Sequence, residues 1–421
     1  MDKFVIEGGH KLSGRVKISG AKNSALALMP AVLLNNGINC FENVPEVNDI
    51  FTMIKLLKHL GVNANFENNS LELDSSNITN QDAPYEHVKK MRASVYVLGP
   101  LLAKYGYAKV SMPGGCAWGP RPINLHLEAL EKLGAQIILD GGDIIAKAER
   151  LHGANINFDI SSVGATGNTI MAAVLAKGES KIQNAAIEPE ITNLCEYLIS
   201  MGARISGVGS STLLIDGVDE LKPANGEIIG DRIEAGTLLI AGAITKSKIE
   251  IEYNNINHLG AVLSKLEDSG AKIILNNNLI ELDSCNIDAK SVDISTAIYP
   301  GFPTDMQAQW ISYMTLANGT ATVIDNIYTD RFSHVPELIR LGANIEQSNN
   351  MAIVRGVKKL KGAKVMSTDL RASASLVLGG LVAEGTTEVL RIYHLDRGYE
   401  KIEQKLTQLG AKIERVKTTE F

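Results

Sequence analysis

Cys116 lies in a segment that can form neither a helix nor a strand. Three glycines and three prolines surround it between Ser111 and Pro122, and these residues favour loops. A cysteine beside a cation such as Arg121 can have a lowered pKa, which suits a general acid or a nucleophile. The alternative is an incidental free thiol. We favour the functional interpretation, because this segment also interrupts a repeated pattern in the sequence.

Charged side chains recur at the starts of predicted apolar helices. They are Lys22, Arg92, Asp231, Asp305, Asp369 and Arg371. The acids have a structural explanation, since the helix dipole stabilises a carboxylate there, and Thr304–Gln307 and Asp231–Glu234 fit a capping box. Cations oppose the dipole, but they are favourable if an anion binds between them. We expect Arg397 to begin the last helix in the same way, and we expect a ligand that carries phosphate or carboxylate groups.

Composition and motifs exclude several other functions. With 41 Lys and Arg against 47 Asp and Glu, the net charge of −6 argues against nonspecific nucleic-acid binding. The four cysteines form no CxxC, and no HExxH, GxxxxGK[ST] or GxGxxG pattern occurs, so we expect no metal and no nucleotide cofactor. Cys40, Cys195 and Cys285 are assigned to the core. No signal peptide and no 18-residue apolar run are apparent, so we expect a cytoplasmic protein that does not enter a membrane.

A short signature ending in glycine recurs six times. Its glycines are Gly61, Gly134, Gly202, Gly270, Gly342 and Gly410, at spacings of 68 to 73 residues. Each follows a helical pattern and precedes an apolar strand, as a glycine C-cap would. A second apolar helix precedes each signature. The chain is therefore predicted to contain six units of about 70 residues, each with two helices and several strands.

One unit is longer than the others. The distance from Gly106 to Gly134 is 28 residues, whereas the corresponding distance in four other units is 23 to 25 residues. The extra residues fall in the segment around Cys116, and insertions in one repeat often mark a functional loop. A chain of 421 residues predicts two or three domains, and six units suggest three per domain.

Four segments together resemble the enolpyruvyl transferase family, and in particular its members that act on UDP-N-acetylglucosamine. They are Gly20–Ser24, Pro113–Pro122, Pro303–Gln307 and Asp369–Tyr399. The resemblance extends from Met1 to about Val416, and its most specific element is the cysteine loop. It implies an α/β (α+β) fold of two inverse α/β-barrel-like domains, each with three βαβαββ-type repeats about a pseudo-threefold axis. The implied domains are residues 22–229, and 1–21 with 230–421, with the active site in the cleft between them.

The resemblance also implies the reaction. The enolpyruvyl group of phosphoenolpyruvate moves to the 3′-hydroxyl of UDP-N-acetylglucosamine and phosphate is released, which is the first committed step of peptidoglycan synthesis. No cofactor or metal is implied, and the partners are these two small molecules. We expect a monomer.

Site residues follow from the same resemblance. Cys116 is expected to donate a proton to the enol carbon, and Asp305 to handle the proton of the sugar hydroxyl. Lys22, Arg121 and Arg397 are expected to hold the phosphate and carboxylate of phosphoenolpyruvate. The remaining substrate contacts are Asn23, Arg92, Pro122, Ile123, Asn124, Leu125, Ser162, Val163, Gly164, Ile327, Asp369 and Arg371. The stretch after Gly164 is one residue longer than the family pattern, and Asn48 or Asp49 replaces an expected lysine.

Three alternatives remain open. A transferase of the shikimate pathway has the same fold but uses shikimate 3-phosphate as acceptor, and it lacks the cysteine loop. A binding protein for nucleotide sugars would not need the pair Cys116 and Asp305. A cysteine hydrolase would need a histidine to activate the thiol, and His126, the only nearby one, falls in a helical pattern.

Overall fold

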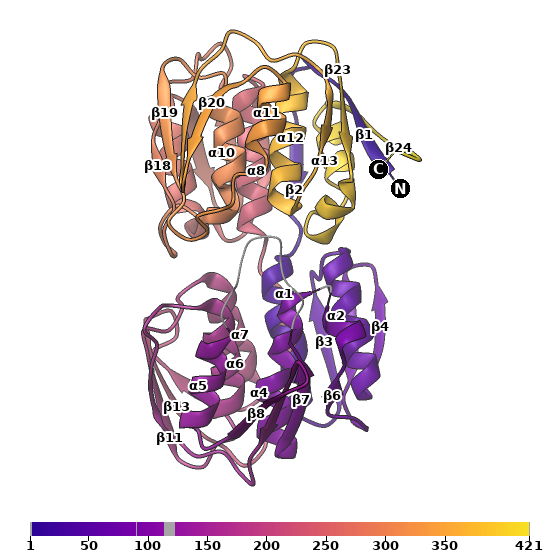
Figure 1. Ribbon diagram of the computed structural model, residues 1–421, viewed down its shortest axis with the longest axis vertical. Helices are drawn as coiled ribbons and strands as arrows, with labels where there is room; N and C mark the ends of the chain where they lie inside the picture. The colour runs from indigo at the N-terminus through magenta and orange to yellow at the C-terminus, as the bar shows by residue number, and fades with distance from the viewer. Residues whose placement is uncertain (1, 90, 113–122, 421) are drawn as a thin grey trace. The chain divides into compact units, whose positions relative to one another are not determined.

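The computed structural model describes residues 2–89, 91–112 and 123–420, and these divide into two compact units. One unit is Gly20–Ile229, and the other combines Met1–Ser19 with Gly230–Phe421. The chain therefore begins in the unit that holds both termini, leaves it after Ser19 to form Gly20–Ile229, and returns to it at Gly230 (Figure 1). We call them the inserted unit and the split unit. Cys116, Arg121 and Pro122 lie outside the described residues.

The inserted unit contains three four-stranded sheets. Their orders are β14-β3-β5-β4, β6-β7-β9-β8 and β10-β11-β13-β12. The strands are β3 (Ile38–Glu42), β4 (Asn63–Glu67), β5 (Ser70–Asp74), β6 (Asp82–Ala83), β7 (Tyr107–Ser111), β8 (Gln136–Asp140), β9 (Asp143–Lys147), β10 (Asn155–Asn157), β11 (Glu179–Gln183), β12 (Arg204–Ser206), β13 (Thr212–Asp216) and β14 (Asn225–Glu227). The helices are α1 (Lys22–Leu28), η1 (Met29–Leu34), α2 (Asn48–Leu60), α3 (Tyr85–Val88), η2 (Arg92–Val97), α4 (Leu98–Tyr105), α5 (Asn124–Lys132), α6 (Val163–Ala173) and α7 (Pro189–Ser200).

The split unit repeats this plan. Its sheets have the orders β16-β17-β15-β2, β18-β19-β21-β20 and β22-β23-β1-β24. The strands are β1 (Asp2–Glu7), β2 (Arg15–Lys17), β15 (Lys248–Glu252), β16 (Lys272–Asn276), β17 (Leu279–Asp283), β18 (Ile294–Ser295), β19 (Thr320–Ile324), β20 (Asn344–Ser348), β21 (Met351–Arg355), β22 (Lys364–Met366), β23 (Thr386–Leu390) and β24 (Lys412–Lys417). The helices are α8 (Arg232–Ile244), η3 (Ile256–Leu259), α9 (Gly260–Asp268), η4 (Thr304–Met306), α10 (Gln307–Met314), α11 (Val335–Arg340), α12 (Leu370–Val382), η5 (Ile392–Arg397) and α13 (Ile402–Gln408).

The predicted sixfold repeat and fold class are confirmed. Each sheet has one parallel strand pair followed by two antiparallel pairs, and two helical segments connect its strands in the order βαβαββ. The six signature glycines end the second helix of each repeat with φ between 96° and 110°. Only glycine adopts this left-handed conformation without strain, which explains why the signature recurs at even spacing.

Each unit is closed by a strand that is distant in sequence. In the inserted unit, β14 from its end pairs in parallel with β3 from its beginning. In the split unit, β1 lies between β23 and β24 and so supplies one of the two inner strands of the last repeat's sheet. In both units, a strand from one end of the unit's sequence therefore completes a sheet whose other strands come from the opposite end.

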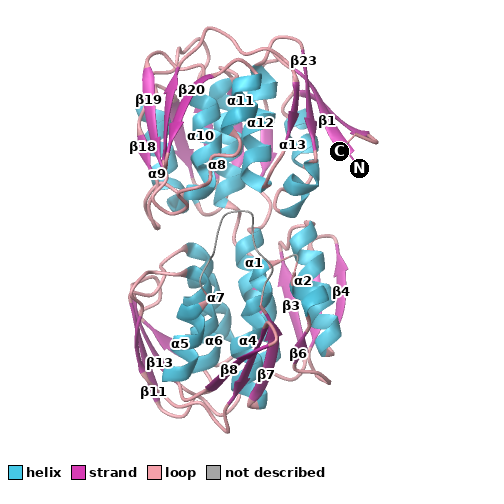
Figure 2. Cartoon of the chain, in the orientation of Figure 1, coloured by secondary structure: helices cyan, strands magenta, loops and turns pink. Residues whose placement is uncertain are grey.

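Helices form the core of each unit and the sheets cover them (Figure 2). The first helix of a repeat is mostly apolar and is buried on nearly all sides, and in α8 every residue from Ile233 to Ile244 is buried. Such a helix belongs in an interior. The sheets bury alternate residues, as the pattern of β3 shows. None of the described helices combines the length and apolar character of a membrane span.

Some local predictions were wrong. Arg397 does not begin the last helix, because it is the final residue of η5 and α13 starts only at Ile402. Cys195 is buried as expected, but Cys40 is half-buried and Cys285 is exposed. Position 285 follows the end of β17, where the chain turns to the surface and the apolar context no longer implies burial.

Candidate functional site

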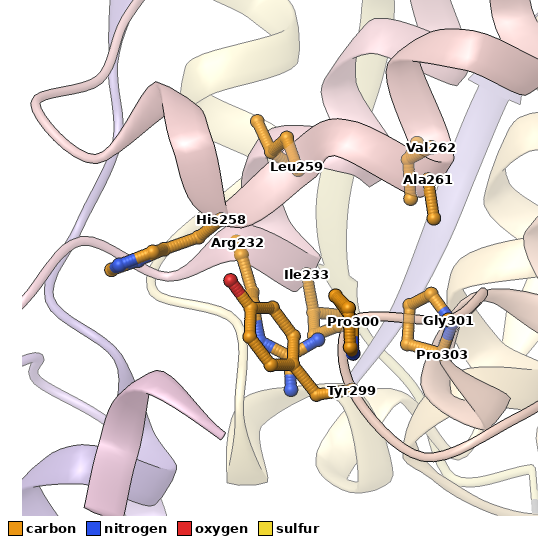
Figure 3. A pocket seen from close by; sticks show the side chains of 10 residues that line it. All are labelled: Arg232, Ile233, His258, Leu259, Ala261, Val262, Tyr299, Pro300, Gly301 and Pro303. Atoms are coloured by element: carbon orange, nitrogen blue, oxygen red, sulfur yellow. The ribbon is translucent and has the colours of Figure 1, made fainter. Parts of the chain in front are cut away.

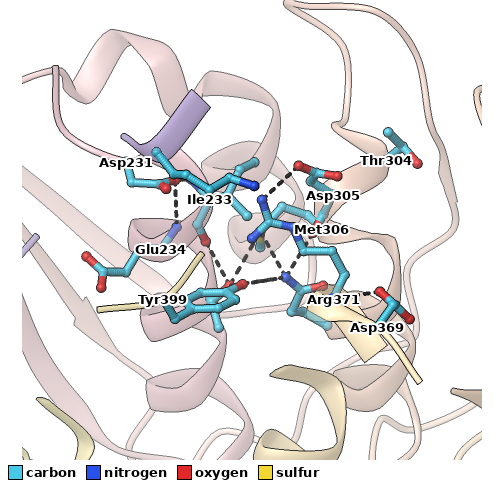
Figure 4. Close-up of polar contacts among 12 residues, drawn as sticks. Asp231, Ile233, Glu234, Thr304, Asp305, Met306, Asp369, Arg371 and Tyr399 are labelled. Atoms are coloured by element: carbon cyan, nitrogen blue, oxygen red, sulfur yellow. Dashed lines mark hydrogen bonds and ion pairs between the residues drawn. The ribbon is translucent and has the colours of Figure 1, made fainter. Parts of the chain in front are cut away.

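Asp305 lies between two guanidinium groups in the split unit (Figure 4). Its Oδ1 accepts a hydrogen bond from Arg331 Nη1 at 2.8 Å, and its Oδ2 accepts one from Arg371 Nη2 at 2.8 Å. Both arginines are buried, with 8% and 3% of their surface exposed. Burial alone would raise the pKa of Asp305, but Arg371 and Arg331 outweigh it and hold the pKa well below its usual range. Asp305 is therefore a carboxylate at neutral pH.

Arg371 is held by its own helix and by an aromatic ring. Asp369 is the N-cap of α12 and accepts hydrogen bonds from the backbone N–H groups of Arg371 and Ala372. The guanidinium lies 5.4 Å from the centre of the Tyr399 ring, a favourable cation–π distance. The Tyr399 hydroxyl is in turn hydrogen-bonded to Thr237 and to Gln309 Nε2. These contacts fix Arg371 before any ligand arrives.

Arg331 was missed by the sequence analysis, and so was the carboxylate behind it. Asp325 is fully buried and follows β19 directly. It accepts hydrogen bonds from the backbone N–H groups of Ile327 and Tyr328 at 3.0 Å, and so fixes the turn that leads to Arg331. A comparison of the repeats could have identified Asp325. Asn43 and Asn184 follow the corresponding strands with positive φ, at 60° and 53°, whereas an aspartate stands at this place after β19.

Thr304 does not cap a helix as predicted. The residue at the N-cap of η4 is Pro303, without a side-chain cap, and the Thr304 hydroxyl is bonded to Asp325 at 2.7 Å instead. The Asp231 prediction is half right. Asp231 caps α8 through Ile233 N and Glu234 N, but Glu234 accepts from Ser19 N rather than from the cap.

Arg397 and Asp369 both act on His394. Burial lowers the pKa of His394, Asp369 raises it, and Arg397 lowers it further. The same Asp369 also raises the pKa of buried His334, but burial dominates there and brings it to about 4. Asp369 therefore acts on His394 together with Arg397, and on His334 together with Arg331. The structure groups three of the expected residues, Asp305, Asp369 and Arg371, around Arg331.

Lys22 has a buried counter-ion in the inserted unit. Its Nζ lies 3.2 Å from Asp49 Oδ2, with 13% and 6% of the two side chains exposed. Asp49 is one of the two residues that replace an expected lysine, and here it holds Lys22 at the start of α1. Asn23, the next residue, is exposed. An ammonium with one carboxylate partner keeps two N–H donors for an anion.

A buried histidine joins three of the segments expected to contact the substrate. His126 of α5 accepts from Asn168 Nδ2 of α6 at 3.1 Å through Nδ1, and the same amide donates to the carbonyl of Val95 in η2. Burial, with help from Arg92, lowers the pKa of His126 to about 4. The network joins η2, α5 and α6, and the N-terminal ends of these three helical segments contain the expected residues Arg92, Ile123, Asn124, Leu125, Ser162, Val163 and Gly164.

His126 is thereby a structural residue. Its ring lies against Gly164, where an added Cβ would meet Nε2 at 3.1 Å, and Ser162 caps α6 through Ala165 N. A neutral, buried imidazole that already accepts a hydrogen bond is poorly suited to activate a thiol. The cysteine-hydrolase alternative loses its base.

A small pocket adjoins the Asp305 turn (Figure 3). It is bordered by Arg232, His258, Tyr299 and Pro303, and the guanidinium of Arg232 lies 5.6 Å from the centre of the Tyr299 ring. Burial and the charge of Arg232 lower the pKa of His258. The pocket therefore has a cation, Arg232, at its border, and Pro303 on the same border directly precedes Thr304.

Fold and site together define a class: a two-unit α/β protein of six βαβαββ repeats, with a buried carboxylate–arginine centre. The chain matches the family described as EPSP synthase (3-phosphoshikimate 1-carboxyvinyltransferase) over residues 6–406, and it belongs to this enolpyruvyl transferase family. Two relatives, from Chloroherpeton thalassium and Prosthecochloris aestuarii, are 57% and 56% identical over 424 and 425 aligned residues. Both are named UDP-N-acetylglucosamine 1-carboxyvinyltransferase, and the alignments cover 100% of this chain and 99% and 100% of theirs.

Solved structures share the fold. The enolpyruvyl transferase NikO from Streptomyces tendae superposes with a TM-score of 0.89 at 23% identity, covering 98% of each chain. An EPSP synthase from Acinetobacter baumannii gives a TM-score of 0.75 at 17% identity, covering 99% of this chain and 100% of its own. At these identities the likeness concerns the fold.

Proposed function

We propose that this protein transfers the enolpyruvyl group of phosphoenolpyruvate to the 3′-hydroxyl of UDP-N-acetylglucosamine, releasing phosphate, as the first committed step of peptidoglycan synthesis. Relatives at 53–57% identity over the full chain carry the name of this activity. The observation that carries the proposal is the ionised Asp305 held between Arg331 and Arg371. A cytoplasmic location and a monomeric state are part of the same proposal.

The reaction needs one acid, one base and several cations. Cys116 gives a proton to the methylene carbon of phosphoenolpyruvate while the sugar hydroxyl oxygen bonds to the adjacent carbon, and Asp305 accepts the hydroxyl proton. The resulting tetrahedral intermediate then loses phosphate through cleavage of its C–O bond. The methyl group gives up a proton to restore the double bond. The net change is exchange of phosphate for the sugar oxygen on the enolpyruvyl carbon.

Cationic side chains supply the anion contacts in this proposal. Lys22, Arg121 and Arg397 hold the phosphate and carboxylate of phosphoenolpyruvate. Among the described residues, Arg331 Nε and Arg371 Nε and Nη1 have no hydrogen-bond partner although they are buried. Buried donors normally have partners, so these N–H groups of Arg331 and Arg371 add to the set of donors for the bound anion. Asn23, Arg92, Ser162 to Gly164 and Ile327 bind the nucleotide sugar.

The test is phosphate release from phosphoenolpyruvate, with UDP-N-acetylglucosamine and shikimate 3-phosphate offered as acceptors in parallel reactions. Release with the nucleotide sugar alone supports the proposal. Release with shikimate 3-phosphate alone keeps the reaction class but replaces the acceptor. Release with neither, together with nucleotide-sugar binding in calorimetry, favours a binding protein.

A further inference from the structure

The Thr304 hydroxyl lies between a buried carboxylate and a site arginine. Its Oγ1 is 2.7 Å from Asp325 Oδ2 and 3.1 Å from Arg331 Nη1. The same Nη1 donates to Asp305 Oδ1 at 2.8 Å. One hydroxyl therefore connects Asp325, whose side chain otherwise accepts from Thr296 and from the backbone N–H groups of Ile327 and Tyr328, to the arginine that holds Asp305.

The direction of these hydrogen bonds is determined by the chemistry of the groups. A guanidinium N–H can only donate, so the Thr304 oxygen accepts from Arg331 and its own hydrogen is left for Asp325. Thr296 makes the same arrangement on the other oxygen, since its hydroxyl accepts from Asn326 N at 3.0 Å and donates to Asp325 Oδ1 at 2.7 Å. Asp325 thus receives only donors, and both hydroxyls are oriented.

We propose that Thr304 is a positioning residue for Asp305: its oriented hydroxyl fixes the Arg331 guanidinium against the buried Asp325, and Arg331 fixes Asp305. The inference rests on the proposed function, in which Asp305 takes the proton of the sugar hydroxyl. Misplacement of a reacting group by about 1 Å can reduce a rate roughly 100-fold. A hydrogen-bonded support behind the arginine limits such movement.

The test compares two threonines that donate to the same carboxylate. Thr304→Val removes the hydroxyl at constant shape, and we expect kcat to fall roughly 10- to 100-fold, with a smaller change in KM for UDP-N-acetylglucosamine. Thr304→Ser keeps the hydroxyl and should restore kcat towards that of the unmodified protein. Thr296→Val removes an equivalent donor from Asp325, but Thr296 contacts neither Arg331 nor Asp305, so kcat should stay close to that of the unmodified protein.

Thermal unfolding of all three variants separates positioning from stability. Equal loss of kcat in Thr304→Val and Thr296→Val, in step with stability, would mean that Asp325 only stabilises the fold and would overturn the inference. So would an unchanged kcat in Thr304→Val. If the unmodified protein releases no phosphate with either acceptor, it is the proposed function that fails.

Discussion

Arg371 Nη2 and Asp305 Oδ2 are 2.8 Å apart, although each is the second residue of a helical segment in a different repeat, and 66 positions separate them in the chain. The repeat explains this proximity. The segments that carry them, η4–α10 and α12, are the first helices of adjacent repeats and pack against each other in the core of the split unit. Equivalent ends of equivalent helices therefore meet.

Replacing Arg371 should change the pH dependence of the reaction. Without this cation, burial raises the pKa of Asp305, because Arg331 alone opposes the desolvation. In Arg371→Gln we expect the acid limb of the kcat/KM profile to move to higher pH, and kcat to fall. The measurement is a pH–rate profile with phosphate release. Arg355→Gln, which breaks an exposed pair with Glu346, should leave the profile unchanged, and an unshifted limb in Arg371→Gln would contradict the proposed base.

Cys116 can be tested against a cysteine outside the site. Cys116→Ala should bind both substrates but lose turnover, whereas Cys116→Asp, which keeps a proton donor, should retain activity if the thiol acts as a general acid. Cys285→Ala is the matched control, since Cys285 is an exposed free thiol, and its turnover should be normal. Calorimetry and phosphate release measure the two effects separately. Full turnover in Cys116→Ala would remove the proton-donor assignment.

The pair Lys22–Asp49 predicts an effect on anion binding. Asp49→Ala removes the acceptor that holds the Lys22 ammonium at 3.2 Å, so the lysine loses its orientation and KM for phosphoenolpyruvate should rise. Asp49→Asn keeps an oxygen acceptor without the charge and should raise KM less. Steady-state kinetics at saturating nucleotide sugar distinguish the two. Identical KM values for both variants would show that charge, rather than orientation, is what Asp49 contributes.

The fold was predictable from the sequence to the extent that it depends on local chemistry. Glycines with left-handed φ end one helix in every repeat, and this requirement keeps them in the sequence at even spacing. Asp231 and Asp369 were also predicted at helix starts, because capping of a helix is local chemistry too. The insertion of β1 between β23 and β24 was not, because strand pairing across nearly the whole chain leaves no local pattern.

The candidate site was predictable only in part. Asp305, Asp369 and Arg371 were found because they stand in recognisable segments, and the structure groups them. Arg331 was missed, since an arginine in a turn has no distinctive neighbours in sequence. The wrong prediction for Thr304 has the same cause: a threonine before a helix fits a local cap, but a buried carboxylate 21 positions later competes for its hydroxyl.

The N-terminal strand should be essential to the stability of the split unit. Phe4 is fully buried in β1, an inner strand of its sheet, and its ring lies 5.1 Å from the Arg415 guanidinium. Phe4→Ala should lower the free energy of unfolding by about 3–5 kcal/mol. Val5→Ala, on the other face of the same strand, should have a smaller effect. Hydrogen exchange should show faster exchange in the split unit and unchanged protection in the inserted unit; equal acceleration in both would contradict the division.

Two buried histidines predict loss of stability in mild acid. Burial lowers the pKa of His126 and of His334 from 6.5 to about 4. Between these values the unfolded chain binds a proton that the folded chain does not, so this stabilisation is complete above about pH 6.5 and is lost as the pH falls to about 4. At 1.36 kcal/mol per pKa unit, each histidine accounts for about 3 kcal/mol.

Substitution by asparagine isolates this contribution. In His126→Asn the side-chain oxygen can replace Nδ1 as acceptor for Asn168, but it cannot be protonated in this range. The variant should be less stable at pH 7, and its free energy of unfolding should decrease less between pH 6.5 and 4. His152→Asn, at an exposed position, is the control and should follow the unmodified protein. Urea unfolding at each pH gives the comparison. An equally steep decrease in His126→Asn would mean that acid sensitivity arises elsewhere, with the carboxylates of Asp305 and its neighbours as the next groups to examine.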